Sequence, residues 1–408
     1  MTATGIQSTS ISSTLFVALE LSKSVWKLGF ACAEHPSLRI RNVAAGDLRQ
    51  FESELLAAKR KFALEDDAGT VTCYEAGRDG FWIHRALEAI GLTNHVIESA
   101  SLEVDRRSKQ RKTDRLDVQK MVHALLRYYR GERGALRPIH VPLMEDEDIR
   151  NLQRGLQSIR KDKRRLTNRI KGLLFAQGIV LGTIDSEFEA ILETLKTGDG
   201  QPIGAYLRKR LQLEFTRLKL CVCQIRELEE QRAELFRQAN AAADQCASRQ
   251  QIADRLVELC GIGVECAWTL STELFSWREF RNRRQLGAVV GLAPTPYSSG
   301  ALNREQGISK AGRGDVRSLL VEVGWLWLRY QPQSDLARWF REKAGGQSSR
   351  MRRIAIVALA RKLVIALWKY AMQGELPRGA KFKSPAQKRR LRKTASLGAV
   401  NLQEVAMA

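Results

Sequence analysis

Short apolar runs alternate with helix-periodic stretches through the first 130 residues. Leu15–Leu19 is continuously apolar and bounded by Ser and Thr, which predicts a buried strand, and further short strands are predicted over Val25–Ala31, Leu38–Asn42, Thr70–Tyr74 and Thr93–Ile97. Apolar positions three and four apart predict helices over Leu48–Phe62, Gly80–Ile90 and Lys112–Tyr129. This order predicts an α/β domain in which a mixed sheet is flanked by helices.

The apolar spacing changes to a repeat of seven in the middle of the chain. The first series is Leu152, Ile159, Leu166 and Leu173, and the second is Leu211, Leu218 and Ile225. Repeats of this kind predict two long helices that form a coiled coil, either within the chain or between two chains. A basic face on such a rod can follow a phosphate backbone, and a solvated face of a dimerisation rod is the alternative.

The last third is mostly helical in pattern, with breaks at glycine and proline. Gly261-Ile-Gly263 separates two helical stretches, which predicts a helix-hairpin-helix-like element whose backbone N–H groups meet a phosphate. A tight turn between packed helices is the alternative. Between Gly287 and Gly307, the Pro-Thr-Pro and Ser-Ser-Gly segments cannot lie inside a helix, so an exposed loop is expected there. Arg350–Tyr370 then predicts an amphipathic helix rich in basic residues.

Composition adds a polyanionic partner to this picture. The 408 residues include 67 Lys and Arg against 45 Asp and Glu, giving a formal net charge of +22. Nucleic acid is the default partner for such an excess, although a generally basic surface is the bland alternative. Residues 1–130 hold 19 basic and 16 acidic residues, whereas residues 131–408 hold 48 and 29. The basic surface therefore belongs to the middle and the end of the chain.

Several protein classes are excluded. No apolar run approaches the roughly 20 residues of a membrane span, and the start of the chain lacks the basic segment of a secretory signal. The seven cysteines are scattered, which indicates neither a disulfide framework nor a zinc site. We therefore expect a protein of the reducing cytoplasm that is not associated with a membrane.

Four carboxylates stand at informative places in the near-neutral first third. Glu20 follows the first predicted strand, Glu75 follows the fourth, and Asp114 and Asp117 share one helix face. If those strands are neighbours, the acids converge at one sheet edge, where cations must neutralise them. Two Mg²⁺ ions could then clamp the attacking and leaving oxygens of a phosphodiester. The alternative is that each acid is an ordinary solvated or capping residue.

Candidate nucleic-acid contacts follow from the basic positions and the glycine turn. They are Arg154, Arg160, Arg164, Arg165 and Arg169 in the rod, Gly261 and Gly263 in the turn, and Lys310, Arg313 and Arg317 after the serine-rich segment. From Arg378 to Lys393 the chain has eight basic residues and no acid, which predicts a phosphate-binding arm or merely a solubilising tail.

Serine is a candidate nucleophile in the segment before Gly300. A serine hydroxyl can attack a phosphodiester where cations stabilise the charge that develops on phosphorus. No histidine is near in sequence to act as a base, because all five lie at or before His140. A Ser/Gly surface loop without chemistry is the alternative.

The motifs together resemble those of the DEDD transposases of the insertion-sequence one-ten family. The resemblance runs from about Leu15 to about Glu375 and is carried by short segments. These are Phe16-Val-Ala-Leu-Glu-Leu-Ser-Lys23, Cys73-Tyr-Glu-Ala-Gly77, Lys112-Thr-Asp-Arg-Leu-Asp117, Gly291-Leu-Ala-Pro294, Ser299-Gly300, Ile308-Ser-Lys-Ala-Gly312 and Ala358-Leu-Ala-Arg-Lys-Leu363.

The resemblance implies a RuvC-like, RNase H-type domain that binds Mg²⁺ through Glu20, Glu75, Asp114 and Asp117. It implies that Ser299 is the nucleophile and forms a covalent phosphoserine link to DNA; Ser299 is favoured over Ser298 because it directly precedes Gly300. It further implies a homodimer or higher homo-oligomer in which the acids of one subunit face the serine of another. A noncoding bridge RNA would pair with the element ends and the target DNA.

The resemblance also orders the chain into domains. We expect a RuvC-like domain over residues 1–130, a coiled-coil helical hairpin over 131–245, a mostly α, serine-bearing domain over 246–376, and a basic tail over 377–408. One departure concerns Glu20, where the family has Asp: the extra methylene changes how the carboxylate reaches Mg²⁺. The alternative functions are a RuvC-like structure-specific endonuclease and a non-catalytic nucleic-acid-binding remnant.

Overall fold

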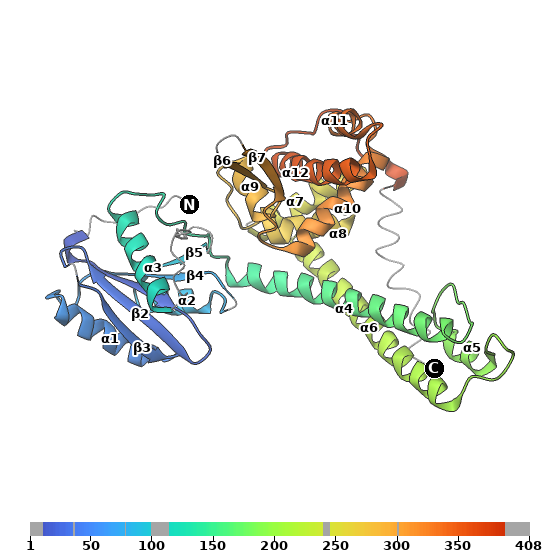
Figure 1. The fold of residues 1–408 in the computed structure, drawn as a ribbon, viewed down its shortest axis with the longest axis horizontal. Coiled ribbons are helices and arrows are strands. Elements are labelled where there is room, and N and C mark those ends of the chain that lie inside the picture. Colours follow the sequence, from blue (N-terminus) through green and yellow to red (C-terminus); the bar gives the residue numbers. More distant parts are fainter. Residues whose placement is uncertain are drawn as a thin grey trace. The chain divides into compact units, whose positions relative to one another are not determined.

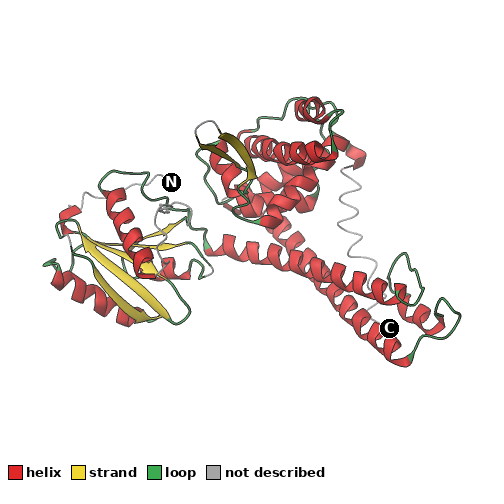
Figure 2. Cartoon of the chain, in the orientation of Figure 1, coloured by secondary structure: helices red, strands yellow, loops and turns green. Residues whose placement is uncertain are grey.

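The computed structural model describes residues 11–35, 37–77, 79–98, 114–239, 245–299 and 302–387 (Figures 1 and 2). The chain divides into two compact units, Met1–Val141 and Pro142–Ala408, each described by itself. Within the described ranges, every helix is too short or too polar to cross a lipid bilayer.

The first unit alternates strands and helices in the predicted order. After a short 3-10 turn, Ile11–Ser13, its elements are β1 (Leu15–Glu20), β2 (Val25–Cys32), β3 (Arg39–Ala44), α1 (Leu48–Lys61), β4 (Thr70–Glu75), α2 (Trp82–Ala89), β5 (Thr93–Ile97) and α3 (Asp114–Tyr129). The expectation of a mixed α/β domain is thus confirmed. The observed bounds differ in one useful respect, because Glu20 and Glu75 are the last residues of their strands rather than the first residues after them.

The five strands form one sheet in the order β3-β2-β1-β4-β5. β1 runs antiparallel to β2 and parallel to β4, and β4 is parallel to β5. The central strand β1 is apolar from Leu15 to Leu19 because these residues are buried on both faces of the sheet. Leu15, Val17 and Leu19 pack with α1 and α2, whereas Phe16 and Ala18 pack with α3. The sheet therefore lies between two helical layers.

Helix α3 crosses the sheet opposite to the direction of β1. Its last residue, Tyr129, has its ring 5.3 Å from that of Phe16 near the start of β1. Val118, in its second turn, lies against Gly29, which pairs with Ala18 near the end of β1. The first turn of α3 is therefore placed over the carboxyl end of β1.

The second unit is mostly helical. Its elements are α4 (Met144–Phe175), α5 (Phe188–Thr194), α6 (Ala205–Ala239), α7 (Gln245–Glu258), α8 (Val264–Leu270), the π-helical turn η3 (Ser271–Phe275), α9 (Arg283–Val289), β6 (Pro294–Ser299), β7 (Leu302–Ile308), α10 (Gly314–Tyr330), α11 (Asp335–Ala344) and α12 (Ser349–Gln373). The helices α4 and α6 extend side by side from the remaining helices (Figure 1).

The two long helices pair within the chain and run antiparallel. Arg169 of α4 contacts Glu214 of α6, and Arg160, earlier in α4, contacts Glu229, later in α6. Their apolar seam includes Leu166, Ile170, Leu174, Leu211, Phe215 and Leu218, with α5 packed at the far end. The predicted seven-residue repeats thus include buried positions of a helical pair, and a coiled coil between chains stays a prediction.

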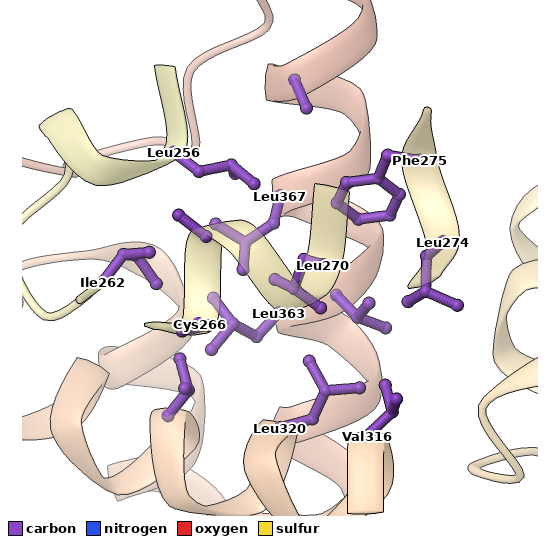
Figure 3. Packing of buried hydrophobic residues seen from close by; sticks show 14 of the residues in the cluster. Leu256, Ile262, Cys266, Leu270, Leu274, Phe275, Val316, Leu320, Leu363 and Leu367 are labelled. Atoms are coloured by element: carbon purple, nitrogen blue, oxygen red, sulfur yellow. The ribbon is translucent and has the colours of Figure 1, made fainter. Parts of the chain in front are cut away.

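The remaining helices surround one apolar core. Figure 3 shows Leu270 of α8, Leu320 of α10 and Leu363 of α12 directed toward one another, and all three are fully buried. α7 and α9 close this core with Leu256 and Leu286. The core fixes the base from which the β6–β7 hairpin projects.

The expectation of an exposed loop before Gly307 is wrong. Residues 294–299 and 302–308 form the antiparallel hairpin β6–β7, in which Ser299 pairs with Leu302. The prolines misled the prediction because they exclude a helix but are tolerated at strand starts and bulges. Pro294 is the first residue of β6, and the pairing register shifts between it and Pro296.

Candidate active site and nucleic-acid interface

Two of the four predicted carboxylates end neighbouring parallel strands. Leu19 pairs with Tyr74, and Glu20 and Glu75 are the next residues on β1 and β4. Residues two apart on a strand face the same side of a sheet. Glu20 follows Ala18, and Glu75 follows Cys73, in the series that packs with α3. Both half-buried acids therefore lie on the α3 face, at one edge.

The first turn of α3 carries the other two acids to that same end of the sheet. Asp114 begins the helix and is exposed, and Asp117 is half-buried. The Oδ2 atom of Asp117 is buried and has no hydrogen-bond partner among the described residues, which leave out 99–113. A buried carboxylate oxygen without a donor is costly, and a bound cation would remove that cost.

The donor set fits magnesium in its chemistry. Mg²⁺ prefers carboxylate oxygens and retained waters, and no donor from the described part of the chain contacts the Asp117 Oδ2 atom. Within the described ranges, however, no three His, Cys, Asp or Glu side chains are already gathered closely enough to hold a metal ion. The structure brings the four positions to one end of one face of the sheet, and their role in metal binding stays a prediction.

The hairpin that carries Ser299 is anchored by two glycines that pack against each other's segments. Gly291 has φ +70°, and a Cβ there would lie 2.1 Å from the carbonyl oxygen of Ala311. Gly312 has φ +66°, and a Cβ there would lie 2.1 Å from the carbonyl oxygen of Val289. Only glycine fits such positions. The Gly-Leu-Ala-Pro and Ser-Lys-Ala-Gly segments thus pack against each other at the base of the hairpin.

Ser298 and Ser299 occupy consecutive positions at the end of β6, paired with Asn303 and Leu302. Consecutive strand positions lie on opposite faces of the ladder. The choice between these two serines stays a prediction. Gly300 lies outside the described residues.

The three basic candidates that follow the hairpin have different surroundings. Lys310 is exposed and has the unusual positive φ of +55°. Arg317 donates to the carbonyl oxygen of Ala311 at 3.1 Å and so stabilises the Ser-Lys-Ala-Gly segment at the base of the hairpin. Arg313 forms ion pairs with Asp315 and, at 2.6 Å, with Glu273. Burial lowers the pKa of Arg313, but these acids outweigh it and hold that pKa above the usual value.

Glu273 links helix α4 to the segment that follows the β6–β7 hairpin, and it was not among the residues predicted from the sequence. Its side chain is 2% exposed, and it accepts from Arg150 at 3.4 Å, from Arg154 at 3.0 Å and from Arg313 at 2.6 Å. It lies in η3, and a π-helical turn often marks a functional position. The available signal was a lone charged residue among the apolar and hydroxyl side chains of Trp268–Phe275.

The predicted basic face of α4 divides into paired and exposed residues. Arg154 pairs with Glu273, Arg169 with Glu214, and Arg160 with Glu229 and Glu265. The sequence hid these pairs because every acid comes from another element. The remaining two candidates, Arg164 and Arg165, are exposed, and Arg165 forms a 3.1 Å pair with Asp162 on its own helix. Their contact with nucleic acid stays a prediction.

Burial would raise the pKa of the Glu265 carboxyl. The guanidinium groups of Arg160 and Arg232 outweigh burial and hold that pKa below its usual value. Glu265 of α8 is therefore ionised, and it forms ion pairs with Arg160 of α4 and, at 2.7 Å, with Arg232 of α6.

The glycine turn between α7 and α8 is packed on one side and open on the other. Gly261 has φ +87°, and a Cβ there would approach the carbonyl oxygen of Leu326 to 3.3 Å. Gly263 has open space where a Cβ would lie. Residues 381–383 cover the turn, since the N–H of Cys260 donates to the carbonyl oxygen of Lys381 at 3.1 Å. The start of the predicted tail is thus docked, and the residues after 387 lie outside the described ranges.

Comparisons with known proteins give a consistent result. Residues 253–337 match the family model described as Transposase IS116/IS110/IS902 family. The chain is 39% identical over 377 residues to y4rJ of Sinorhizobium fredii (strain NBRC 101917 / NGR234), a protein named as a transposase; this covers 91% of the chain and 95% of the relative. It is 26% identical over 300 residues to the transposase for insertion sequence element IS1111A of Coxiella burnetii, covering 74% and 77%. It is 29% identical over 237 residues to the transposase for insertion sequence element IS1328 of Yersinia enterocolitica, covering 57% and 66%.

Proposed function

This chain belongs to the IS116/IS110/IS902 family of transposases, and we propose that it cleaves and rejoins DNA strands with Mg²⁺ through a covalent phosphoserine at Ser299. The transposase role follows from similarity to transposases of insertion sequences. The chemical mechanism, the metal and the guide RNA are our proposals.

One observation carries the catalytic proposal. Glu20 and Glu75 end adjacent parallel strands on the face that α3 covers, and the first turn of α3 sets the unpartnered Asp117 oxygen at the same end. The strand order β3-β2-β1-β4-β5 supports an RNase H-type domain of the RuvC-like kind. Among the described residues, a buried carboxylate oxygen without a donor beside two strand-terminal acids supports a bound cation.

Glu20, Glu75, Asp114 and Asp117 would hold magnesium, which when bound supplies positive charge to the scissile phosphate and its leaving oxygen. The protein's own part is to position these acids. Gly29 lets α3 approach the sheet closely, because a side chain there would collide with Val118. The resulting placement presents four carboxylates toward one end of the fold.

Each step at Ser299 forms one phosphoester bond and breaks another. The Ser299 hydroxyl oxygen attacks phosphorus and loses its proton to solvent, while one P–O bond to deoxyribose breaks and the released oxygen takes up a proton. In the rejoining step a DNA hydroxyl attacks the phosphoserine and restores Ser299. One phosphoester bond replaces another throughout, so no external energy source is needed.

We also propose a homodimer or higher oligomer and a noncoding guide RNA. Tyr206, Leu213 and Leu220 lie seven apart on α6, and all three are exposed, at 95%, 52% and 58%. They face away from the seam with α4, so they are available to a second copy. The +19 balance of residues 131–408 supports phosphate binding, and the resemblance alone supports the RNA.

The decisive experiment traps the covalent intermediate. The protein is incubated with labelled element-end DNA, the element's noncoding RNA and Mg²⁺, then denatured, and protein-linked label is measured. Wild type and Ser298→Ala should form the adduct, and Ser299→Ala should not. An equal adduct with Ser299→Ala would refute this nucleophile, and cleavage without any adduct would favour the endonuclease alternative.

The metal ligands are tested by charge-neutral substitution. Glu20→Gln, Glu75→Gln and Asp117→Asn should each lower adduct yield at limiting Mg²⁺, and Glu20→Asp tests the departure from the family's Asp. Glu52→Gln, at an exposed position of α1, is the matched control. Unchanged yield with Glu20→Gln across Mg²⁺ concentrations would remove Glu20 from the site.

A further inference from the structure

The first six residues of α12 stand outside the packed body of the second unit. Every residue from Ser349 to Ile354 is exposed, and burial begins only at Ala355 and Ile356. Six consecutive helical residues span more than one and a half turns. This end of α12 is therefore exposed around its whole circumference.

The projecting end is basic and holds no acid. It carries Arg350, Arg352 and Arg353, and none of these guanidinium groups has an ion-pair partner among the described residues. Cations in the first turn of a helix are destabilising because they lie next to the positive end of the helix macrodipole. An anion that binds there removes this unfavourable interaction. Met351 and Ile354 lie three apart on one face of the same end and are 42% and 51% exposed.

The preceding helix and turn extend this basic surface. α11 contributes Arg341 and Lys343 beside Glu342, whereas its Arg338 is ion-paired with Asp335 of the same helix. Only four residues, 345–348, separate α11 from α12, and Gly345 is required because a Cβ there would lie 2.5 Å from the carbonyl oxygen of Arg341.

The relation of the two helices is fixed by packing. Phe340 and Ala344 of α11 share an apolar cluster with Ala355 and Leu359 of α12. Two packed helices with a short glycine turn, the second presenting its N-terminal end, form the arrangement by which helix-turn-helix proteins enter DNA. Unlike the turn before α8, this end has no chain segment over it among the described residues.

We propose that the projecting end of α12, flanked by the end of α11, docks in the major groove of double-stranded DNA. The inference rests on the proposed function in taking DNA as the substrate. The B-form major groove is about 12 Å wide and admits a helix, whereas the A-form RNA groove is too deep and narrow. The arginines match phosphates and guanine edges, and Met351 and Ile354 match thymine methyl groups.

The test compares two triple variants that remove equal charge. R350Q/R352Q/R353Q removes the α12 arginines, and R49Q/R60Q/K61Q removes three exposed basic residues of α1. Affinity for a DNA duplex of about 30 base pairs and for the same duplex in RNA is measured against salt concentration. Unchanged thermal melting of both variants establishes that they fold.

Three lost phosphate contacts should lower the salt slope for duplex DNA by about 3. The wild-type advantage over the α12 variant should accordingly shrink about 40-fold between roughly 50 and 200 mM salt. The α1 variant should keep the wild-type slope. Equal slopes for all three proteins, or a loss confined to RNA, would overturn the proposal.

Methylation of guanine N7 tests the groove. It should weaken binding by wild type more than binding by the α12 variant, because that atom lines the major groove. Equal sensitivity of the two proteins would refute major-groove docking. Duplex affinity is measured separately from adduct formation, so the two proposals are tested by different readouts. An absent serine adduct with a confirmed α12 effect would therefore reject the proposed chemistry alone.

Discussion

Replacing Gly29 with alanine should push α3 off the sheet at the end where the carboxylates lie. The added Cβ would be 2.2 Å from Cγ1 of Val118, whereas carbon atoms pack at about 3.5–4.0 Å. The helix or the strand must therefore move by about 1.5 Å, which typically costs about 2 kcal/mol in a packed core. A domain of this size loses roughly 4 °C per kcal/mol, so we expect a fall in Tm of about 8 °C.

The rescue variant makes this prediction specific. Val118→Ala removes the colliding methyl group, so the double variant should be more stable than the two separate losses predict, with a coupling of about 2 kcal/mol. Gly134→Ala is the control, since no atom lies within 4 Å of a Cβ there. Thermal denaturation of the full-length chain measures all four variants.

The same displacement of α3 should also lower the catalytic activity, because α3 carries Asp114 and Asp117. A shift of about 1 Å in a catalytic group can reduce activity by about 100-fold. The Mg²⁺-dependent adduct should therefore fall with Gly29→Ala and recover in the double variant. A single variant as stable as Gly134→Ala, or strictly additive losses, would refute the close approach of Gly29 and Val118 as the reason for this glycine.

Two further predictions concern buried charge. Glu273→Gln leaves Arg150 buried without its anion and should lower the free energy of unfolding, measured in urea, by about 3 kcal/mol; this figure is discounted for the partly exposed arginines that share the site. Glu230→Gln, at an exposed position, is the control and should change stability little. An equal loss in both variants would contradict the role of burial. Burial lowers the pKa of His84 and His95, so the unfolded chain takes up protons first, and stability should fall as pH drops below about 6.5. His84→Gln/His95→Gln should lose less stability than wild type between neutral pH and about pH 5.5; the same loss in both would exclude these histidines.

The sequence predicted the first unit well because its signals are local. Strand β1 begins with the apolar run Leu15–Leu19, and its neighbour β4 is a short segment of strand-forming residues that ends in Glu75, so the convergence of Glu20 and Glu75 could be expected. The end of α3 that carries Asp117 followed from helical spacing. The close approach at Gly29 could not be predicted, because it depends on a contact between residues 89 positions apart.

The second unit was harder because its charges pair over long distances. Arg154, Arg160 and Arg169 look like one free basic face when α4 is considered alone, and acids from α6, α8 and η3 complete them. The β6–β7 hairpin was missed for a different reason. Proline and serine argue against a helix without distinguishing a loop from a strand, and long-range packing through Gly291 and Gly312 decides between them.

The arrangement around Glu273 makes the tolerance of its members unequal. Three guanidinium groups from two distant segments share one carboxylate, so the loss of any single arginine still leaves that carboxylate two cationic partners. Loss of the carboxylate removes the ion-pair partner of both Arg150 and Arg154, while Arg313 keeps Asp315. Redundancy therefore protects the arginines individually and never the acid, and sequence drift at this junction should be free to exchange Arg154 or Arg313 long before it can exchange Glu273.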